Sequence, residues 1–347
     1  MEGNTPRDRS INPRLKQLRR KNIYNVDELF MGIREGNIVQ LSKAITLVES
    51  KNPQHQEAAR KLINKCLPLS GNSIRIGITG TPGVGKSTFI ESFGLYLIEQ
   101  GHKIAALTID PSSQISKGSI LGDKTRMEKL SIADNAFIRP SPAGDSLGGV
   151  ARKTRETIIL CEAAGFNRIL IETVGVGQSE TAVHSMVDLF TLLLLPGGGD
   201  ELQGIKRGIV EMADIVLVNK SDEDRIKLAR ETRRSYSNAL HLFPPKENGW
   251  TVKVLNTSGL SGNGIDKLEE QIQLFHQHVS DNGSFQRKRE QQASYWMDES
   301  LKNQLMEAFE RTPGIEEMLV QLKENVIDNK ISPFHAADQL IKHFLKR

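Results

Sequence analysis

The sequence predicts an α/β fold in which a doubly wound, mostly parallel sheet is covered by helices on both faces. Short apolar runs of strand length recur between residues 74 and 256, and helix-length segments separate most of them. These runs are apolar throughout rather than alternating, which is typical of strands that are buried on both faces. We predict strands at 74–79, 104–109, 168–173, 189–195, 215–219 and 252–256, and helices at 86–100, 148–164, 202–213, 223–240 and 264–280.

Helical patterns flank this α/β region. Apolar residues recur at helical spacing from Val26 to Val48, and Pro53 interrupts the pattern before a second helix that ends at Cys66. After 281 the chain becomes highly charged and helical in pattern, and it is too polar to form a core of its own. We therefore expect a basic tail and N-terminal helical segment at 1–69, the α/β domain at 70–280, and a C-terminal helical arm at 281–347 that packs on another surface, such as a second copy of the chain.

Composition excludes several classes of protein. The 347 residues carry 46 basic and 42 acidic side chains, and this balance of +4 is too weak to indicate a nucleic-acid partner. Seven basic residues in the first 21 favour a solvated tail over a targeting peptide. No apolar run could cross a bilayer, so we expect a cytoplasmic protein without a membrane partner. The two cysteines, Cys66 and Cys161, are expected to be buried and reduced.

One glycine-rich motif predicts a phosphate-binding loop. Residues 80–87 fit the pattern G-x-x-x-x-G-K-[ST], with a predicted strand before them and a predicted helix after them. The glycines let backbone N–H groups point at phosphate oxygens, Lys86 is expected to reach the β- and γ-phosphates, and the Ser87 hydroxyl is expected to ligate Mg²⁺. The residues predicted to contact the nucleotide here are Gly80, Thr81, Pro82, Gly83, Val84, Gly85, Lys86, Ser87 and Thr88.

A second motif predicts that the base is guanine. Asn219-Lys220-Ser221-Asp222 follows an apolar strand, and a carboxylate there can accept two hydrogen bonds from the Watson–Crick edge of guanine. Adenine offers no such donor pair, so its binding would leave the carboxylate unpaired. After the next strand, Ser258 and Gly259 are expected to complete the site, with the Ser258 backbone N–H donating to guanine O6. The sequence therefore predicts a GTPase that binds GTP or GDP with Mg²⁺.

Three acidic residues are candidates for the Mg²⁺ site. Asp110 and Glu172 each end a predicted strand, at the edge where ligands bind in open α/β sheets, and Asp123 lies in a polar loop between them. Mg²⁺ takes only one or two direct carboxylates, so some of these acids should act through water. We assign Ser87, Asp110, Asp123 and Glu172 to the metal, and Lys86, Asp110 and Glu172 to catalysis.

Two further features concern the switching loops. Ras-like GTPases place a glutamine after the switch glycine, whereas here Gly175 is followed by Val176, which predicts slow intrinsic hydrolysis. A second glycine run begins after Pro196. It is interpreted either as a moving loop that senses the nucleotide and touches a partner or as a plain strand-to-helix turn. Its candidate switch residues are Asp200, Glu201, Gln203 and Lys206.

Several segments together resemble the MeaB/ArgK family of SIMIBI-class P-loop GTPases. They are the phosphate loop, Asp-Pro-Ser-Ser (110–113), Gly-Ser-Ile-Leu-Gly-Asp-Lys-Thr-Arg-Met (118–127), Arg-Pro-Ser-Pro (139–142), Leu-Gly-Gly-Val-Ala (147–151), Glu-Thr-Val-Gly-Val-Gly-Gln-Ser-Glu (172–180), Gly-Asp-Glu-Leu-Gln-Gly-Ile-Lys (199–206) and Ser-Pro-Phe-His-Ala-Ala (332–337). The resemblance implies a homodimeric GTPase chaperone for a cobalamin-dependent acyl-CoA mutase, typically methylmalonyl-CoA mutase. Such a chaperone gates adenosylcobalamin loading and protects or reactivates the mutase. The family usually has Ser-Ala where this chain has Ser258-Gly259.

Two other functions are compatible with the motifs. A GTPase that inserts a metal into nickel enzymes would share the fold, but it would want Cys or His ligands near the nucleotide or a His-rich tract, and the sequence shows neither. A nucleotide-dependent phosphotransferase, matching the transport-kinase label given to some family members, would want adenine use and an acceptor pocket. The guanine-reading residues argue against the second alternative.

Overall fold

The computed structural model describes residues 24–50, 52–109, 127–141, 147–173, 179–197 and 207–345. The chain divides into two compact units. One comprises Met1–Gly71 with Ile159–Gly165, and the other comprises Asn72–Ile158 with Phe166–Arg347. In these described ranges, no helix is both long and apolar enough to cross a membrane.

The described residues of the first unit form the helices α2 (Val26–Arg34), α3 (Ile38–Glu49) and α4 (Pro53–Cys66), followed by the 3₁₀ turn η1 (Leu67–Leu69). The sequence pattern predicted one helix before Pro53, but the structure has two. Gly36 takes a φ of +73°, a left-handed conformation that ends α2, and the Asn37 side chain then caps the first amides of α3. Both cysteines are buried and neither forms a disulfide, as predicted.

The second unit contains a seven-stranded sheet in which every pair is parallel, in the order β3-β2-β4-β1-β5-β6-β7. The predicted fold class is therefore confirmed. The strands are β1 (Ile74–Gly80), β2 (Ile104–Ile109), β3 (Ala136–Ser141), β4 (Arg168–Thr173), β5 (Leu189–Leu194), β6 (Ile215–Val218) and β7 (Lys253–Asn256).

Strand β3 was missed by the sequence prediction. It lies at the edge of the sheet, where it pairs only with β2, and it contains Arg139, Pro140 and Ser141. An edge strand needs no continuous apolar run, and it tolerates proline because its backbone is paired on one side only. The signal that identifies the central strands is therefore absent from β3.

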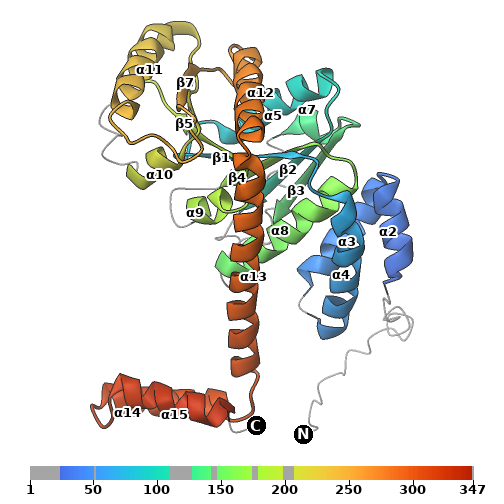
Figure 1. Cartoon of the computed structure of the whole chain (residues 1–347), viewed down its shortest axis with the longest axis vertical. Helices are drawn as coiled ribbons and strands as arrows, with labels where there is room; N and C mark the ends of the chain where they lie inside the picture. Colours follow the sequence, from blue (N-terminus) through green and yellow to red (C-terminus); the bar gives the residue numbers. More distant parts are fainter. Residues whose placement is uncertain are drawn as a thin grey trace, which may run out of the picture. The chain divides into compact units, whose positions relative to one another are not determined.

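Helices cover both faces of this sheet (Figure 1). In this view α5, α7 and α12 lie on one side, and α8 and α9 lie on the other. The bounds are α5 (Lys86–Glu99), α7 (Glu128–Ser131), α8 (Leu147–Ala163), α9 (Ser179–His184), α10 (Arg207–Met212), η3 (Glu223–Arg225), α11 (Ile226–Leu240) and α12 (Ile265–Asp281). Apolar side chains of the central strands pack with Phe89 and Phe93 of α5 and with Ile272 and Phe275 of α12, so the core fixes the start of α5 against the sheet.

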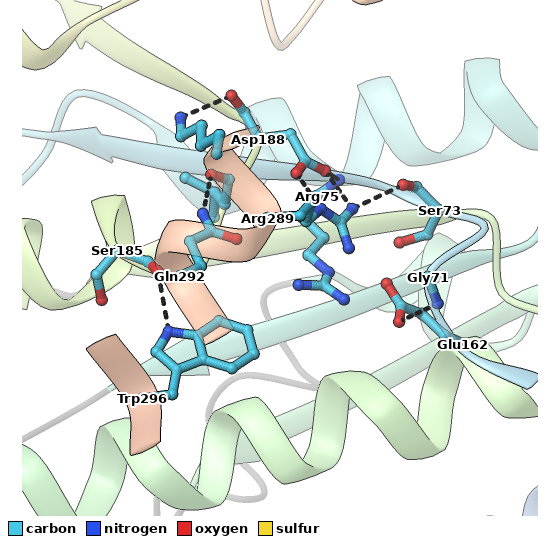
Figure 2. Close-up of polar contacts among 11 residues, drawn as sticks. Gly71, Ser73, Arg75, Glu162, Ser185, Asp188, Arg289, Gln292 and Trp296 are labelled. Carbon is cyan, nitrogen blue, oxygen red and sulfur yellow. Dashed lines mark hydrogen bonds and ion pairs between the residues drawn. The ribbon is translucent and has the colours of Figure 1, made fainter. Parts of the chain in front are cut away.

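The C-terminal arm consists of α13 (Ser284–Glu310), α14 (Ile315–Ile327) and α15 (Pro333–Leu345). Helices α14 and α15 share a small cluster of buried side chains that includes Ile315, Leu322 and Leu340. The first half of α13 lies against the beginning of β5, as Figure 2 shows. The arm is thus joined to the α/β unit by specific contacts and not only by the chain.

Candidate functional site

The loop between β1 and α5 has the backbone that the glycine-rich motif requires. Gly80, Gly83 and Gly85 have φ values of +152°, +79° and +91°, a region that other residues rarely adopt. At Gly80 a Cβ atom would lie 2.6 Å from the carbonyl oxygen of Leu193, so β5 also leaves no room for a side chain there. The loop therefore turns tightly onto the N-terminus of α5, where amides and the helix dipole favour an anion.

Lys86, the first residue of α5, folds back over this loop. Its ammonium donates hydrogen bonds to the carbonyl oxygens of Gly80 (2.8 Å) and Thr81 (3.3 Å), and only 7% of the residue is exposed. Burial lowers the pKa of Lys86, and the negative charges of Glu172 and Glu180 partly offset this effect. A buried cation at the N-terminus of α5, beside this loop, is suited to a triphosphate.

Ser87 and Glu172 lie together beside this lysine. The Ser87 hydroxyl donates to Oε1 of Glu172 over 3.3 Å, and Glu172 is only 5% exposed at the carboxyl end of β4. A hydroxyl next to a buried carboxylate is the kind of oxygen pair that Mg²⁺ prefers, so the two residues fit the metal predicted for them. Asp110 and Asp123 lie outside the described residues. Among the described residues no group of three or more His, Cys, Asp or Glu side chains gathers as a metal site.

Asn219 connects the phosphate loop to the base-reading loops. It follows β6 and is 2% exposed. Its amide nitrogen donates to the carbonyl of Val84 over 2.9 Å, and its side-chain oxygen accepts the backbone N–H of Gly259 over 3.0 Å. Lys220, with a φ of +56°, extends its ammonium to the carbonyl of Gly83 at 2.8 Å. These bonds join three segments that are distant in sequence.

The structure corrects one predicted role in the base-reading loops. The backbone N–H of Ser258 donates to the carbonyl of Asn263 over 2.9 Å, inside its own loop, so it is not directed at a base as the sequence suggested. The Ser258 hydroxyl instead donates to the carboxylate of Asp222. Ser258 therefore orients the carboxylate to which the sequence assigned guanine recognition.

Glycine at position 259 has a physical reason. A Cβ atom there would lie 2.9 Å from both the backbone nitrogen and the Cα of Phe89, so an alanine would require α5 to shift. Gly259 thus lets the base-reading loop pack directly on α5.

These loops enclose a pocket of about 380 Å³ that combines both motifs. Its walls carry the amide of Asn219 and the carboxylate of Asp222 on one side and the end of the phosphate loop, at Gly85 and Thr88, on the other. The lining residues are Gly85, Thr88, Asn219, Lys220, Asp222, Glu223, Asp224, Arg225, Gly259 and Leu260. A polar pocket of this size beside an anion-binding loop suits a purine whose phosphates lie on that loop.

Four more of the predicted site residues lie outside the described residues, and the sequence prediction did not name Glu180. The candidate switch residues Asp200, Glu201, Gln203 and Lys206 lie outside the described residues. Glu180 was not predicted as a site residue, yet it is 1% exposed in α9 and its charge acts on Lys86. The available signal was its place eight residues after Glu172 in the same glycine-rich segment.

Comparison with known proteins agrees with this site. A family described as "Methylmalonyl Co-A mutase-associated GTPase MeaB" matches residues 41–313. The chain belongs to this family. It is also 42% identical to the GTPase ArgK of Escherichia coli K12, over 89% of this chain and 93% of that protein. It is 46% identical to the mouse protein named methylmalonic aciduria type A homolog, mitochondrial, over 93% of this chain and 80% of that protein.

A solved structure supports the same assignment. The crystal structure named LAO/AO transport system kinase matches with a TM-score of 0.73 and 35% sequence identity, covering 94% of this chain and 100% of that one. The resemblance predicted from the motifs is therefore confirmed, and this MeaB-family chain is a P-loop GTPase.

Replacing Asp222 by Asn should weaken GTP binding and shift the base preference. The amide puts a donor where guanine also donates, which should cost ~1–3 kcal/mol, or roughly 5–150-fold in the dissociation constant measured by calorimetry. Xanthine carries a carbonyl in place of the exocyclic amine, so xanthosine triphosphate should bind the variant better than the parent. Asp224→Asn makes the same chemical change in the same pocket and should leave the preference for guanine intact. An unchanged preference in Asp222→Asn would remove this residue from base selection.

Replacing Ser87 by Ala should make GTP binding less dependent on Mg²⁺. The hydroxyl is a proposed metal ligand, and its loss should reduce the gain in GTP affinity on adding Mg²⁺ by roughly tenfold. Titrations with and without the metal measure this gain, and Ser131→Ala on the surface of α7 is the control. Equal gains in the parent and Ser87→Ala would contradict the assignment.

Proposed function

We propose that this MeaB-family GTPase is a chaperone for a cobalamin-dependent acyl-CoA mutase of the methylmalonyl-CoA mutase type. In this proposal, GTP binding and hydrolysis gate the loading of adenosylcobalamin and protect or reactivate the mutase. The observation that carries it is the family match over 41–313, which includes the nucleotide site and all of α13. We also propose a cytoplasmic location.

The described residues give the nucleotide cycle a physical basis. Amides of the phosphate loop and the ammonium of Lys86 would bind the phosphates, and Asp222 would select the base. Ser87 and Glu172 would hold Mg²⁺, which supplies neutralisation of phosphate charge when it is bound. Asp110 and Asp123 are proposed to assist at the metal, and Asp110 to assist in hydrolysis together with Lys86 and Glu172. The loop with Asp200, Glu201, Gln203 and Lys206 is proposed to contact the mutase.

The arm supports a homodimer. On α13, Met297, Leu301 and Leu305 follow one another at four-residue spacing and are 65%, 56% and 52% exposed. Residues at this spacing share one face of a helix. On α15, Phe334 is 83% exposed. Exposed apolar faces on an extended arm favour pairing with a second copy, because each face would then be withdrawn from water.

Turnover with a mutase tests the chaperone proposal. Alone, the protein should hydrolyse GTP slowly, and purified methylmalonyl-CoA mutase should raise the rate by on the order of tenfold while forming a complex detectable by gel filtration. Lys86→Ala should remove the stimulated hydrolysis, which excludes a contaminating GTPase. Finding neither a complex nor stimulation would reduce the conclusion to a GTPase without this client.

Introducing acidic residues into the exposed apolar face of α13 should dissociate the proposed dimer into monomers. The double change Leu301→Asp and Leu305→Asp buries two carboxylates if the faces pair, so sedimentation should show a monomer at micromolar concentration. Asn303→Asp adds a carboxylate to the opposite face of the same helix and should leave the dimer intact. A monomeric parent protein, or a dimer unaffected by the double change, would show that this face does not mediate pairing.

A further inference from the structure

The N-terminal half of α13, here called the arm base (residues 288–296), forms hydrogen bonds with residues 185–188, the short segment between α9 and β5. Three side chains from one face of α13 donate to three backbone carbonyls there (Figure 2). Lys288 donates to Asp188 over 2.8 Å, Gln292 to Val187 over 2.8 Å, and the Trp296 indole to Ser185 over 3.1 Å. These hydrogen bonds hold the backbone of the segment at three of its four residues, 185, 187 and 188.

A buried ion pair fixes the same segment to the sheet. Arg289 contacts both carboxylate oxygens of Asp188, at 2.5 and 2.6 Å, and also donates to the carbonyl of Ser73 over 3.0 Å. The Asp188 side chain is 2% exposed and accepts the backbone N–H of Arg75 over 2.8 Å. Arg289 therefore bridges the starts of β1 and β5 from the arm (Figure 2).

Trp296 has charged neighbours on the α/β unit. Its ring lies 5.2 Å from the guanidinium carbon of Arg155 and 5.7 Å from that of Arg75. Arg155 also donates to the hydroxyl of Ser185 over 3.4 Å. A shift of Ser185 by a fraction of an ångström would therefore alter both the hydrogen bond and the electrostatic surroundings of the indole.

The segment 185–188 is connected to the GTPase site through α9. This helix ends at His184, immediately before Ser185, and carries the buried Glu180 whose charge acts on Lys86. Beneath it, Val183 and Val187 pack on Gly77 of β1, where a Cβ atom would lie 3.0 and 3.1 Å from them. The segment is thus close-packed on the strand that leads into the phosphate loop.

We propose that Arg289 and Trp296 are positioning residues of the GTPase site. They hold residues 185–188, and through α9 and the packing of Val183 and Val187 on β1 they fix the strand that leads into the phosphate loop. Because coupling between two sites acts in both directions, a change at the phosphates also changes the surroundings of Trp296. The surroundings of Trp296 therefore differ between the GDP-bound and the GTP-bound protein. This inference depends on the GTPase site and not on the identity of the proposed client.

The two tryptophans of the chain, Trp250 and Trp296, allow a direct test. Trp250→Phe leaves Trp296 as the sole indole, and its fluorescence emission should shift between the complexes with GDP and with a non-hydrolysable GTP analogue, both with Mg²⁺. Trp296→Phe leaves Trp250, whose indole donates to Asp214, and should show a much smaller shift. Calorimetry confirms that both proteins bind both nucleotides. Identical Trp296 emission in the two complexes would overturn the proposal.

Kinetics distinguish positioning from simple stabilisation. Trp296→Phe keeps an aromatic ring but removes the donor to Ser185, so kcat for GTP should fall severalfold while KM changes less. Tyr295→Phe, a loss of one polar group at the neighbouring position, should leave kcat unchanged. Both variants are compared at a temperature where circular dichroism shows each to be folded. An unchanged kcat in Trp296→Phe would mean that the indole only anchors the arm.

Discussion

The site depends on the hydrogen bonds of one buried amide, that of Asn219. Its nitrogen bonds the phosphate loop at Val84 and its oxygen bonds the backbone of Gly259, so the phosphate loop and the loop after β7 have a fixed separation. An amide can do this because it carries a donor and an acceptor on one rigid group. At 2% exposure, either bond left unmade would carry the full desolvation cost of its group, roughly 1–3 kcal/mol. The spacing between the phosphate loop and the proposed base-reading loops is therefore fixed before any ligand binds.

The parallel sheet explains why these loops meet at all. All seven strands run in the same direction, so the segments after β1, β4, β6 and β7 emerge at one edge. Lys86, Asn219 and Ser258 follow β1, β6 and β7, Glu172 lies at the carboxyl end of β4, and all four gather there. Close packing then sharpens the arrangement, because Gly80 lies on the β5 backbone and Gly259 on the α5 backbone, where no side chain fits. Small displacements of these strands are therefore transmitted rather than absorbed.

At the opposite end of the sheet, where the strands begin, a buried ion pair between Asp188 and Arg289 joins α13 to β1 and β5. Asp188 is nearly inaccessible, and an ionised carboxylate there is tolerable only because Arg289 and the Arg75 amide satisfy it. Such a pair contributes little net stability, but breaking it by removing one partner typically costs about 3–5 kcal/mol. It therefore specifies a geometry, with α13 placed on the starts of β1 and β5. The arm is therefore fixed to the sheet by side-chain hydrogen bonds and an ion pair at the starts of β1 and β5.

The sequence by itself determined the fold class, the phosphate loop and the guanine-reading motif. These rest on local patterns, namely continuous apolar strands and glycines at positions that require a left-handed backbone. Strand β3 and the break at Gly36 were not evident, because an edge strand lacks the apolar signal and a helix can end without proline. Only the tertiary structure showed that the Ser258 hydroxyl orients Asp222, that Glu180 acts on Lys86, and that Arg289 meets Asp188 from 101 residues away. Such contacts are decided by how the chain packs, and no spacing along the sequence encodes the distance between side chains on different elements.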